Sequence, residues 1–68
     1  MAKKINITER KKQIIELVAE GKSNSEIAEQ LTITIHTVKS HLVELFNKLG
    51  ISSKCELVAW GFRNGILE

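Results

Sequence analysis

The chain has 68 residues, of which 43% are hydrophobic, and a formal net charge of +2 at pH 7. This length supports one hydrophobic core and excludes two domains. No apolar run reaches the roughly 18 residues of a membrane span, and no cleavable secretory signal opens the chain, so we expect a cytoplasmic protein with no membrane partner. The single cysteine, Cys55, excludes an internal disulfide.

The charges are unevenly distributed along the chain. Lysine and arginine are concentrated in residues 1–12, whereas the charged residues within 17–30 are mostly acidic. A basic start is typical either of a nucleic-acid contact or simply of a solvated arm. We therefore treat residues 1–6 as a basic N-terminal arm or the edge of an excised segment, and residues 7–68 as the folded domain.

A first helix is predicted over residues 9–20. Thr8 is a suitable N-cap, and Gly21 is a natural residue just beyond the C-terminus. Between them the apolar residues fall on one broad stripe, which we expect to be buried. These residues are Ile14, Ile15, Leu17 and Val18.

A second helix is predicted over residues 24–31. Ser23 and Glu26 have the spacing of a capping box, in which each side chain accepts from the other residue's free N–H. The expected buried face consists of Ile27, Ala28 and Leu31. A turn of about three residues follows, in which Thr34 caps the next helix while Ile33 packs beneath the turn.

The third helix, residues 35–49, has the strongest periodicity of the chain and stops at Gly50. Its inward residues are Val38, Leu42, Leu45, Phe46 and Leu49. A fourth helix is predicted over residues 54–63, ending near Gly65, because Ser53 and Glu56 repeat the capping-box spacing. No alternating strand pattern is present, so the expected fold is all-α with four helices.

A short helix, a tight turn and a longer helix form the helix-turn-helix unit, which places its second helix in the DNA major groove. The outward face of the third helix carries His36, Lys39, Ser40, Val43 and Asn47. Lys39 can donate to guanine O6 and N7, Ser40 to several bases, and the Val43 methyls can contact a thymine methyl. We expect Lys39, Ser40, Val43 and His36 to read bases.

A second set of polar residues surrounds this face and is suited to phosphates rather than bases. Hydroxyls, amides, ammonium groups and free N–H groups at helix N-termini all bind phosphate oxygens. The candidates are Ser23, Asn24, Thr34, Thr37, Lys48 and Lys54. Such contacts would supply affinity and register without sequence choice.

The same residues also bear on three other functions: protein docking, catalysis and metal binding. A small helical module that docks another protein is the main alternative to DNA binding, because every amphipathic helix has a polar face. A chain this short leaves little volume for an active site, so we expect no enzyme and no cofactor. His36 and His41 are five residues apart, unlike a helical metal pair, and Cys55 adds too few ligands for zinc.

Five short segments, taken in order and at their spacing, resemble the LuxR (GerE-type) helix-turn-helix domain. They are Thr8-Glu9-Arg10, Glu20-Gly21-Lys22-Ser23-Asn24, Glu26-Ile27-Ala28, Thr37-Val38-Lys39-Ser40-His41 and Lys48-Leu49-Gly50. The likeness runs from about Ile7 to Phe62. No single segment is specific for this family, but the five together, in this order and at this spacing, are a strong indication of it.

This resemblance implies sequence-specific binding of double-stranded DNA within a bacterial transcription regulator, such as a response regulator of a two-component system. It further implies a homodimer through the fourth helix, where Cys55, Ala59 and Phe62 form an apolar stripe suited to the interface. RNA polymerase is an additional candidate partner. The target sequence does not carry over, because Ser40 and Val43 occupy positions that vary within the family.

The sequence departs from the family pattern at two positions. Lys11 stands where the family usually has the glutamate of a capping box, which places a charge unfavourable to the helix dipole near the N-terminus. Ile35 replaces a commonly polar residue at the start of the third helix. It belongs either to the core or to an added apolar contact with DNA.

Overall fold

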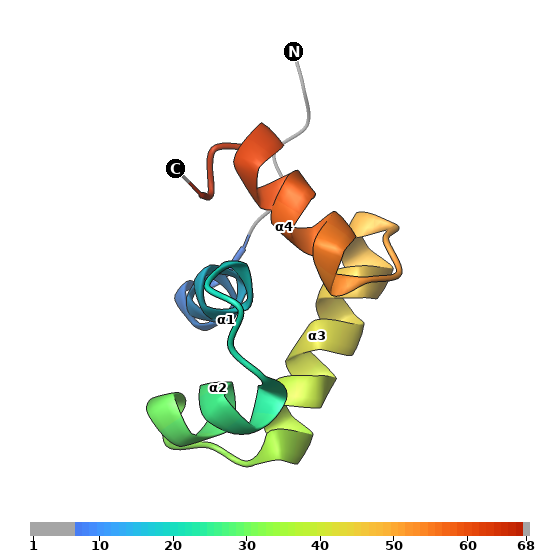
Figure 1. Ribbon diagram of the computed structural model, residues 1–68. Helices are drawn as coiled ribbons and strands as arrows, with labels where there is room; N and C mark the ends of the chain where they lie inside the picture. Colours follow the sequence, from blue (N-terminus) through green and yellow to red (C-terminus); the bar gives the residue numbers. More distant parts are fainter. Residues whose placement is uncertain (1–6, 68) are drawn as a thin grey trace.

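The computed structural model describes residues 7–67, which form four helices (Figure 1). These are α1 (Glu9–Ala19), α2 (Asn24–Leu31), α3 (Ile35–Leu49) and α4 (Lys54–Arg63). The predicted all-α class and the order of the helices are confirmed. The predicted arm, residues 1–6, lies outside the described residues. Within 7–67, no helix is long and apolar enough to cross a membrane.

Helix α1 begins at the predicted residue and ends one residue earlier than predicted. The Thr8 hydroxyl accepts from the Lys11 N–H at 3.2 Å, which confirms the N-cap. The helix ends at Ala19 with Glu20 as its C-cap, one residue before the predicted end. Gly21 then adopts φ +85°, a conformation that glycine reaches without the Cβ clash of other residues. The chain therefore turns sharply into α2.

The turn between α2 and α3 is three residues long, as predicted, but its backbone was not anticipated. Thr32 adopts the left-handed conformation, with φ 58° and ψ 47°, although it is β-branched. This conformation lets the Ile33 N–H donate to the Ala28 carbonyl at 2.9 Å, closing the end of α2. The tight connection thus rests on one residue in a costly backbone region.

The predicted capping box of α4 is only half correct. The Ser53 hydroxyl accepts from the Glu56 N–H at 3.2 Å, as expected. The Glu56 carboxylate, however, accepts from the N–H of Ser52 at 3.0 Å and not from that of Ser53. Ser52 and Ser53 both also donate their hydroxyls to it, at 3.0 and 3.3 Å. With two adjacent serines, the carboxylate caps the preceding residue instead.

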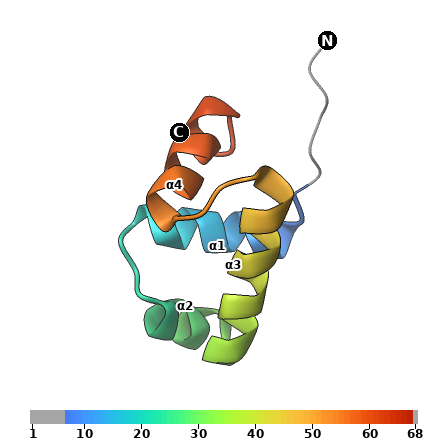
Figure 2. The same cartoon turned by 90° about the vertical axis from the view of Figure 1, so that its right-hand side faces the viewer.

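The core is centred on α1, which lies between α4 and α2, with α3 crossing beside all three (Figure 2). Helix α2 packs chiefly on α3, and α4 chiefly on α1. Three of the residues predicted to face inward, Leu31, Phe46 and Leu49, are only half-buried against the core. The buried apolar side chains come from every helix, as the periodicity predicted. They are Ile14, Ile15, Leu17, Val18, Ile27, Ala28, Val38, Leu42, Leu45 and Leu57.

The segment after α4 folds back onto the core, which was not predicted. The N–H groups of Ile66 and Leu67 both donate to the Gly61 carbonyl, at 2.9 and 3.0 Å. A Cβ at Gly61 would lie 2.8 Å from Leu67 Cδ1 and 3.3 Å from Ile15 Cγ2. The absence of a side chain at Gly61 therefore lets this segment pack closely against α4.

Candidate nucleic-acid interface

The four residues expected to read bases lie together on the outside of α3. Spaced over two helical turns, His36, Lys39, Ser40 and Val43 are all exposed, and with Glu44 they line one shallow hollow. Val43 exposes 55% of its surface, so most of this side chain is not packed against the core. The inward and outward faces of α3 are thus those that the periodicity predicted.

The start of α3 differs electrostatically from the starts of the other helices. Thr34 caps it by accepting from the Thr37 N–H at 3.1 Å, and the two hydroxyl oxygens lie 2.9 Å apart. Helices α1, α2 and α4 each carry a glutamate in the first turn, whereas α3 carries none. The partial positive charge at the N-terminus of α3 is therefore left for an external anion.

The exposure of Ile35 excludes one of its two predicted roles. It lies in the first turn of α3 and exposes 43% of its surface, so it is not a core residue. An exposed apolar side chain at the start of the outward-facing helix is placed to contact a bound molecule.

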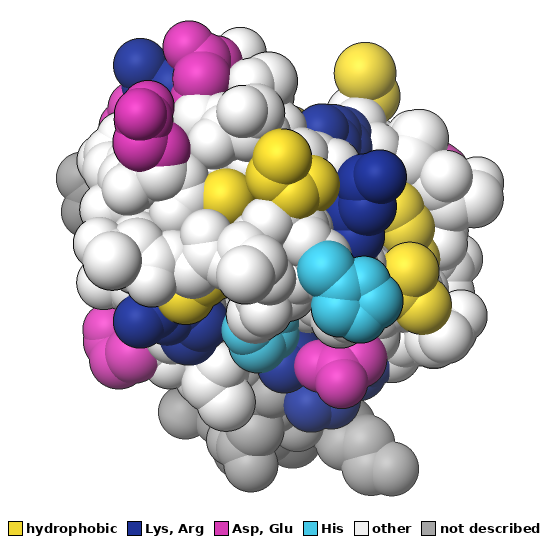
Figure 3. Space-filling model, turned by 90° about the horizontal axis from the view of Figure 1, so that it is seen from below, with side chains coloured by type: hydrophobic (Ala, Val, Ile, Leu, Met, Phe, Trp, Pro, Cys, Tyr) yellow, Lys and Arg dark blue, Asp and Glu magenta, His cyan; other side chains and the backbone are white. Residues whose placement is uncertain are grey.

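This end of the molecule mixes several kinds of side chain. Figure 3, which looks from below onto α2 and the start of α3, shows histidine, basic and hydrophobic side chains next to one another. Several acidic side chains gather at one corner of the same view, and another lies directly beside a histidine. Short polar, cationic and methyl-bearing groups in one patch match the mixed chemistry of base edges and phosphates.

An ion pair at the edge of this face was not predicted from the sequence. The Lys11 ammonium lies 2.9 Å from Glu44 Oε1, and the Lys11 side chain is only 15% exposed. The hydrogen bond from Lys11 is the main reason why the pKa of Glu44 is held below its ordinary value. Lys11, which was expected only to destabilise the N-terminus of α1, thus links α1 to α3 through this ion pair.

His41 lies next to this pair and is half-buried. Its Nδ1 is 3.9 Å from Glu44 Oε1 and, within the described part of the chain, makes no hydrogen bond. His41 thus differs from His36, whose side chain is exposed on the outer face of α3.

The start of α2 holds two of the predicted phosphate contacts. The Ser23 N–H donates to Glu26 Oε1 at 2.8 Å, and the Ser23 hydroxyl accepts from the Glu26 N–H at 3.1 Å, which confirms the capping box. The backbone hydrogen bond from Ser23 is the main cause that lowers the pKa of Glu26. By helix geometry, the N–H groups of Asn24 and Ser25 have no intrahelical carbonyl to donate to.

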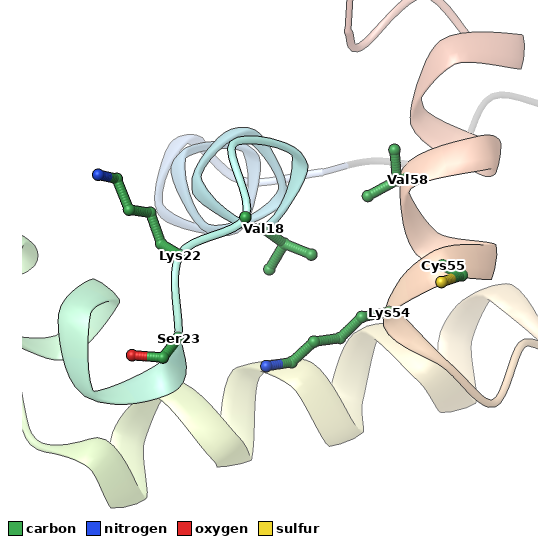
Figure 4. Close-up of a pocket in the computed structure, with 7 residues that line it drawn as sticks. Val18, Lys22, Ser23, Lys54, Cys55 and Val58 are labelled. Carbon is green, nitrogen blue, oxygen red and sulfur yellow. The ribbon is translucent and has the colours of Figure 1, made fainter.

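A third predicted contact, Lys54, joins this site from α4. Its ammonium donates to Asn24 Oδ1 at 2.7 Å, in a partly buried hydrogen bond that links positions 30 residues apart. Figure 4 shows the Lys54 side chain extended from α4 toward the start of α2, where Ser23 lies, while Lys22 points away. The groove beneath it is lined by Val18, Cys55 and Val58.

Lys48 lies apart from the other phosphate candidates. It is exposed in the last turn of α3, eleven residues beyond Thr37. At 1.5 Å per residue this separation is about 16 Å along the helix axis. The structure thus brings Asn24 and Lys54 together at the start of α2, next to Ser23, whereas Lys48 lies near the opposite end of α3 from Thr37.

The predicted dimer stripe lies on the outside of α4. Cys55, Ala59 and Phe62 are exposed, and Phe62 exposes 53% of its surface. Leu57 and Gly61 are buried on the opposite side, and Val58 is half-buried. The stripe is therefore available to a second molecule.

The described residues contain no group of three or more His, Cys, Asp or Glu side chains that could hold a metal ion. Helices α2 and α3 form a helix-turn-helix unit whose second helix has an exposed outer face.

Comparison with known proteins places the chain among such domains. The family model for bacterial regulatory proteins of the luxR family (GerE) matches residues 5–60. A solved structure described as transcription factor GerE superposes with a TM-score of 0.87 at 31% identity, covering 91% of this chain and 92% of that one.

Two longer regulators are also similar. The chain is 40% identical over 63 residues to the transcriptional regulatory protein LiaR of Bacillus subtilis (strain 168), with 93% of this chain covered. It is 39% identical over 62 residues to the oxygen regulatory protein NreC of Staphylococcus aureus (strain JH9), with 91% covered. The chain spans only 30% and 29% of the lengths of these relatives.

Fold and site together define a helix-turn-helix DNA-binding domain of transcription regulators, a class of proteins that are not enzymes. The chain belongs to the luxR family of bacterial regulatory proteins. The resemblance noted in the sequence is thereby confirmed.

Proposed function

We propose that this domain binds double-stranded DNA at specific sequences by placing α3 in the major groove. The observation that carries the proposal is the outward face of α3, where Lys39, Ser40 and the exposed Val43 lie side by side. A major groove about 12 Å wide admits an α-helix of this kind. The reading unit comprises residues 7–68.

Each residue of the face has a chemical role. Lys39 donates to guanine O6 or N7, Ser40 bonds to any of several base edges, and Val43 packs on a thymine methyl. His36, one turn nearer the start of α3, contacts a base at the rim of the hollow. Ile35 adds apolar surface at the same end of the helix.

Phosphate contacts hold the helix in register. Thr34 and Thr37 present hydroxyls at the one helix start whose first turn has no glutamate, and Lys48 presents its ammonium at the other end of α3. Ser23 and Asn24 supply the remaining contacts at the start of α2, and Lys54 belongs to the same phosphate site through its hydrogen bond to Asn24. These groups supply salt-dependent affinity that is shared by all sequences.

The functional unit on DNA is a homodimer. The exposed stripe of Cys55, Ala59 and Phe62 on α4 supplies a self-complementary surface, which a twofold axis requires. Two copies would then place two α3 helices on one duplex and bind two half-sites.

We further propose that the domain is the DNA-binding part of a longer cytoplasmic response regulator in a two-component system. The similarity to LiaR and NreC, of which it matches under a third, supports this assignment. RNA polymerase is the partner proposed for the bound regulator, since regulators of transcription act on that enzyme.

Selection of bound duplexes from a random DNA pool tests the proposal. Sequence-specific binding predicts an enriched motif, and log K for that motif should fall linearly with log salt with a slope reporting several phosphates. Recovery of no motif, with equal and weak binding to all duplexes, would favour the protein-docking module instead.

A further inference from the structure

The hydrogen bond between Lys54 and Asn24 bears on how the proposed phosphate site works, and this inference rests on the proposed DNA binding. The Lys54 ammonium donates to Asn24 Oδ1 at 2.7 Å and is partly buried. Both side chains can bind a phosphate, and from the sequence alone we expected each to do so independently. The structure shows that one bonds to the other across two helices.

The chemistry of the two side chains makes this bond directional. An ammonium group has three donors and no acceptor, whereas an asparagine amide has an acceptor oxygen and a donor NH₂. The side chain of Asn24 can therefore meet Lys54 only through its oxygen. Its NH₂ group is then the end that remains to donate, and a phosphate oxygen accepts hydrogen bonds from such donors.

Without Lys54, the amide of Asn24 could turn either end outward. An outward oxygen would meet a phosphate with acceptor against acceptor and with like partial charges. The first turn of α2 sharpens this requirement, because the carboxylate of Glu26 already lies there, bonded to the Ser23 N–H at 2.8 Å. The backbone N–H groups of Asn24 and Ser25 complete the donor set.

We propose that Lys54 is a positioning residue for DNA binding, which orients the Asn24 amide so that its NH₂ donates to a backbone phosphate. Lys54 reaches across the groove of Figure 4 to do so, from the first residue of α4 to the first residue of α2. Its contribution to affinity therefore passes through Asn24.

A double-mutant cycle tests this coupling. The Kd of a duplex selected from a random pool is measured by fluorescence anisotropy for the wild type, Lys54→Met, Asn24→Ala and the double variant. Lys54→Arg, which keeps donors, is included. Lys22→Met is the matched control, because Lys22 lines the same groove and points away from Lys54. Circular dichroism verifies that each variant keeps its helices.

We expect Lys54→Met and Asn24→Ala each to weaken binding about fivefold, the loss typical of one hydrogen bond. The double variant should bind more weakly than Asn24→Ala only by the factor that Lys22→Met alone produces, which measures the lost charge. Lys54→Arg should stay within about twofold of the wild type. A second double variant, Lys22→Met with Asn24→Ala, should lose the product of its two single losses.

Two results would overturn the inference. One is a double variant whose loss equals the product of the single losses, because Lys54 would then hold a phosphate independently. The other is a Lys54→Arg protein that binds as weakly as Lys54→Met. A wild-type protein that binds no duplex specifically would contradict the proposed function itself, which separates the two failures.

Discussion

Lys11 of α1 and Glu44 of α3 form an ion pair at 2.9 Å that ties the first helix to the edge of the proposed reading helix. Glu44 lines the hollow formed by His36, Lys39, Ser40 and Val43. A carboxylate beside this face would repel DNA phosphates. Its pairing with Lys11 offsets that charge and fixes where it lies.

The ion pair predicts a dependence of stability on pH. Hydrogen bonding to Lys11 lowers the folded-state pKa of Glu44. Its contribution to the free energy of unfolding is therefore fully present above the unfolded pKa of about 4.3, and is lost as pH falls through the lowered value. Lys11→Met should accordingly be less stable than the wild type in urea at pH 7, with a smaller difference at pH 3.

Lys12→Met serves as the control for this comparison, because it removes the same charge from the same helix. Its difference from the wild type should change less between the two pH values. An equal Lys11→Met difference at pH 7 and pH 3 would show that the pair does not stabilise the fold.

Thr32 predicts a stabilising substitution. Its φ of 58° costs a β-branched residue about 1–2 kcal/mol, and glycine adopts it freely. Part of that gain is offset by the greater freedom of glycine in the unfolded chain. Thr32→Gly should therefore raise the free energy of unfolding by about 0.5–1 kcal/mol in urea titrations. Thr32→Ala keeps the strained φ and should give no comparable gain; equal gains in both variants would argue against backbone strain.

Lys39→Ala tests one residue of the reading face. Loss of a base contact should weaken binding to selected duplexes by about 1–3 kcal/mol and relax the preference at one position of the motif. Lys12→Ala removes the same charge from α1 and should cost less and leave the motif unchanged. The assignment of Lys39 fails if the two variants bind with equal affinity and equal preference.

Phe62→Glu tests the α4 interface. A charge in an apolar seam is costly to bury, so the variant should occupy selected duplexes as a monomer where the wild type binds as a dimer. Sedimentation velocity of the complexes measures this difference. Gln30→Glu, an equal charge change at an exposed site on α2, should leave the dimer intact. A wild-type protein that is monomeric both free and on DNA would remove the interface.

The helices were predictable because their determinants are local. Ser23 and Glu26 satisfy each other's N–H groups three residues apart, and the apolar spacing from Val38 to Leu49 defines one face of a helix. The outward residues of α3 follow from the same spacing. Both patterns are readable without knowledge of the fold.

The missed features depend on how distant segments meet. Lys11 and Glu44 pair only because α1 packs on α3, and Lys54 reaches Asn24 only because α4 begins near the start of α2. Local preference argues against the left-handed conformation at Thr32, so the packing of α2 on α3 must impose it. The fold-back of Leu67 onto Gly61 likewise carries no periodic pattern.

An NMR measurement of the complex with a selected duplex tests the placement of α3 in the major groove. With the methyl groups of Val43 labelled, we expect intermolecular NOEs from Val43 to thymine methyl or cytosine H5 protons, which line the major groove. NOEs from Val43 to sugar protons of the minor groove, or unchanged Val43 signals in a specific complex, would contradict the placement of α3.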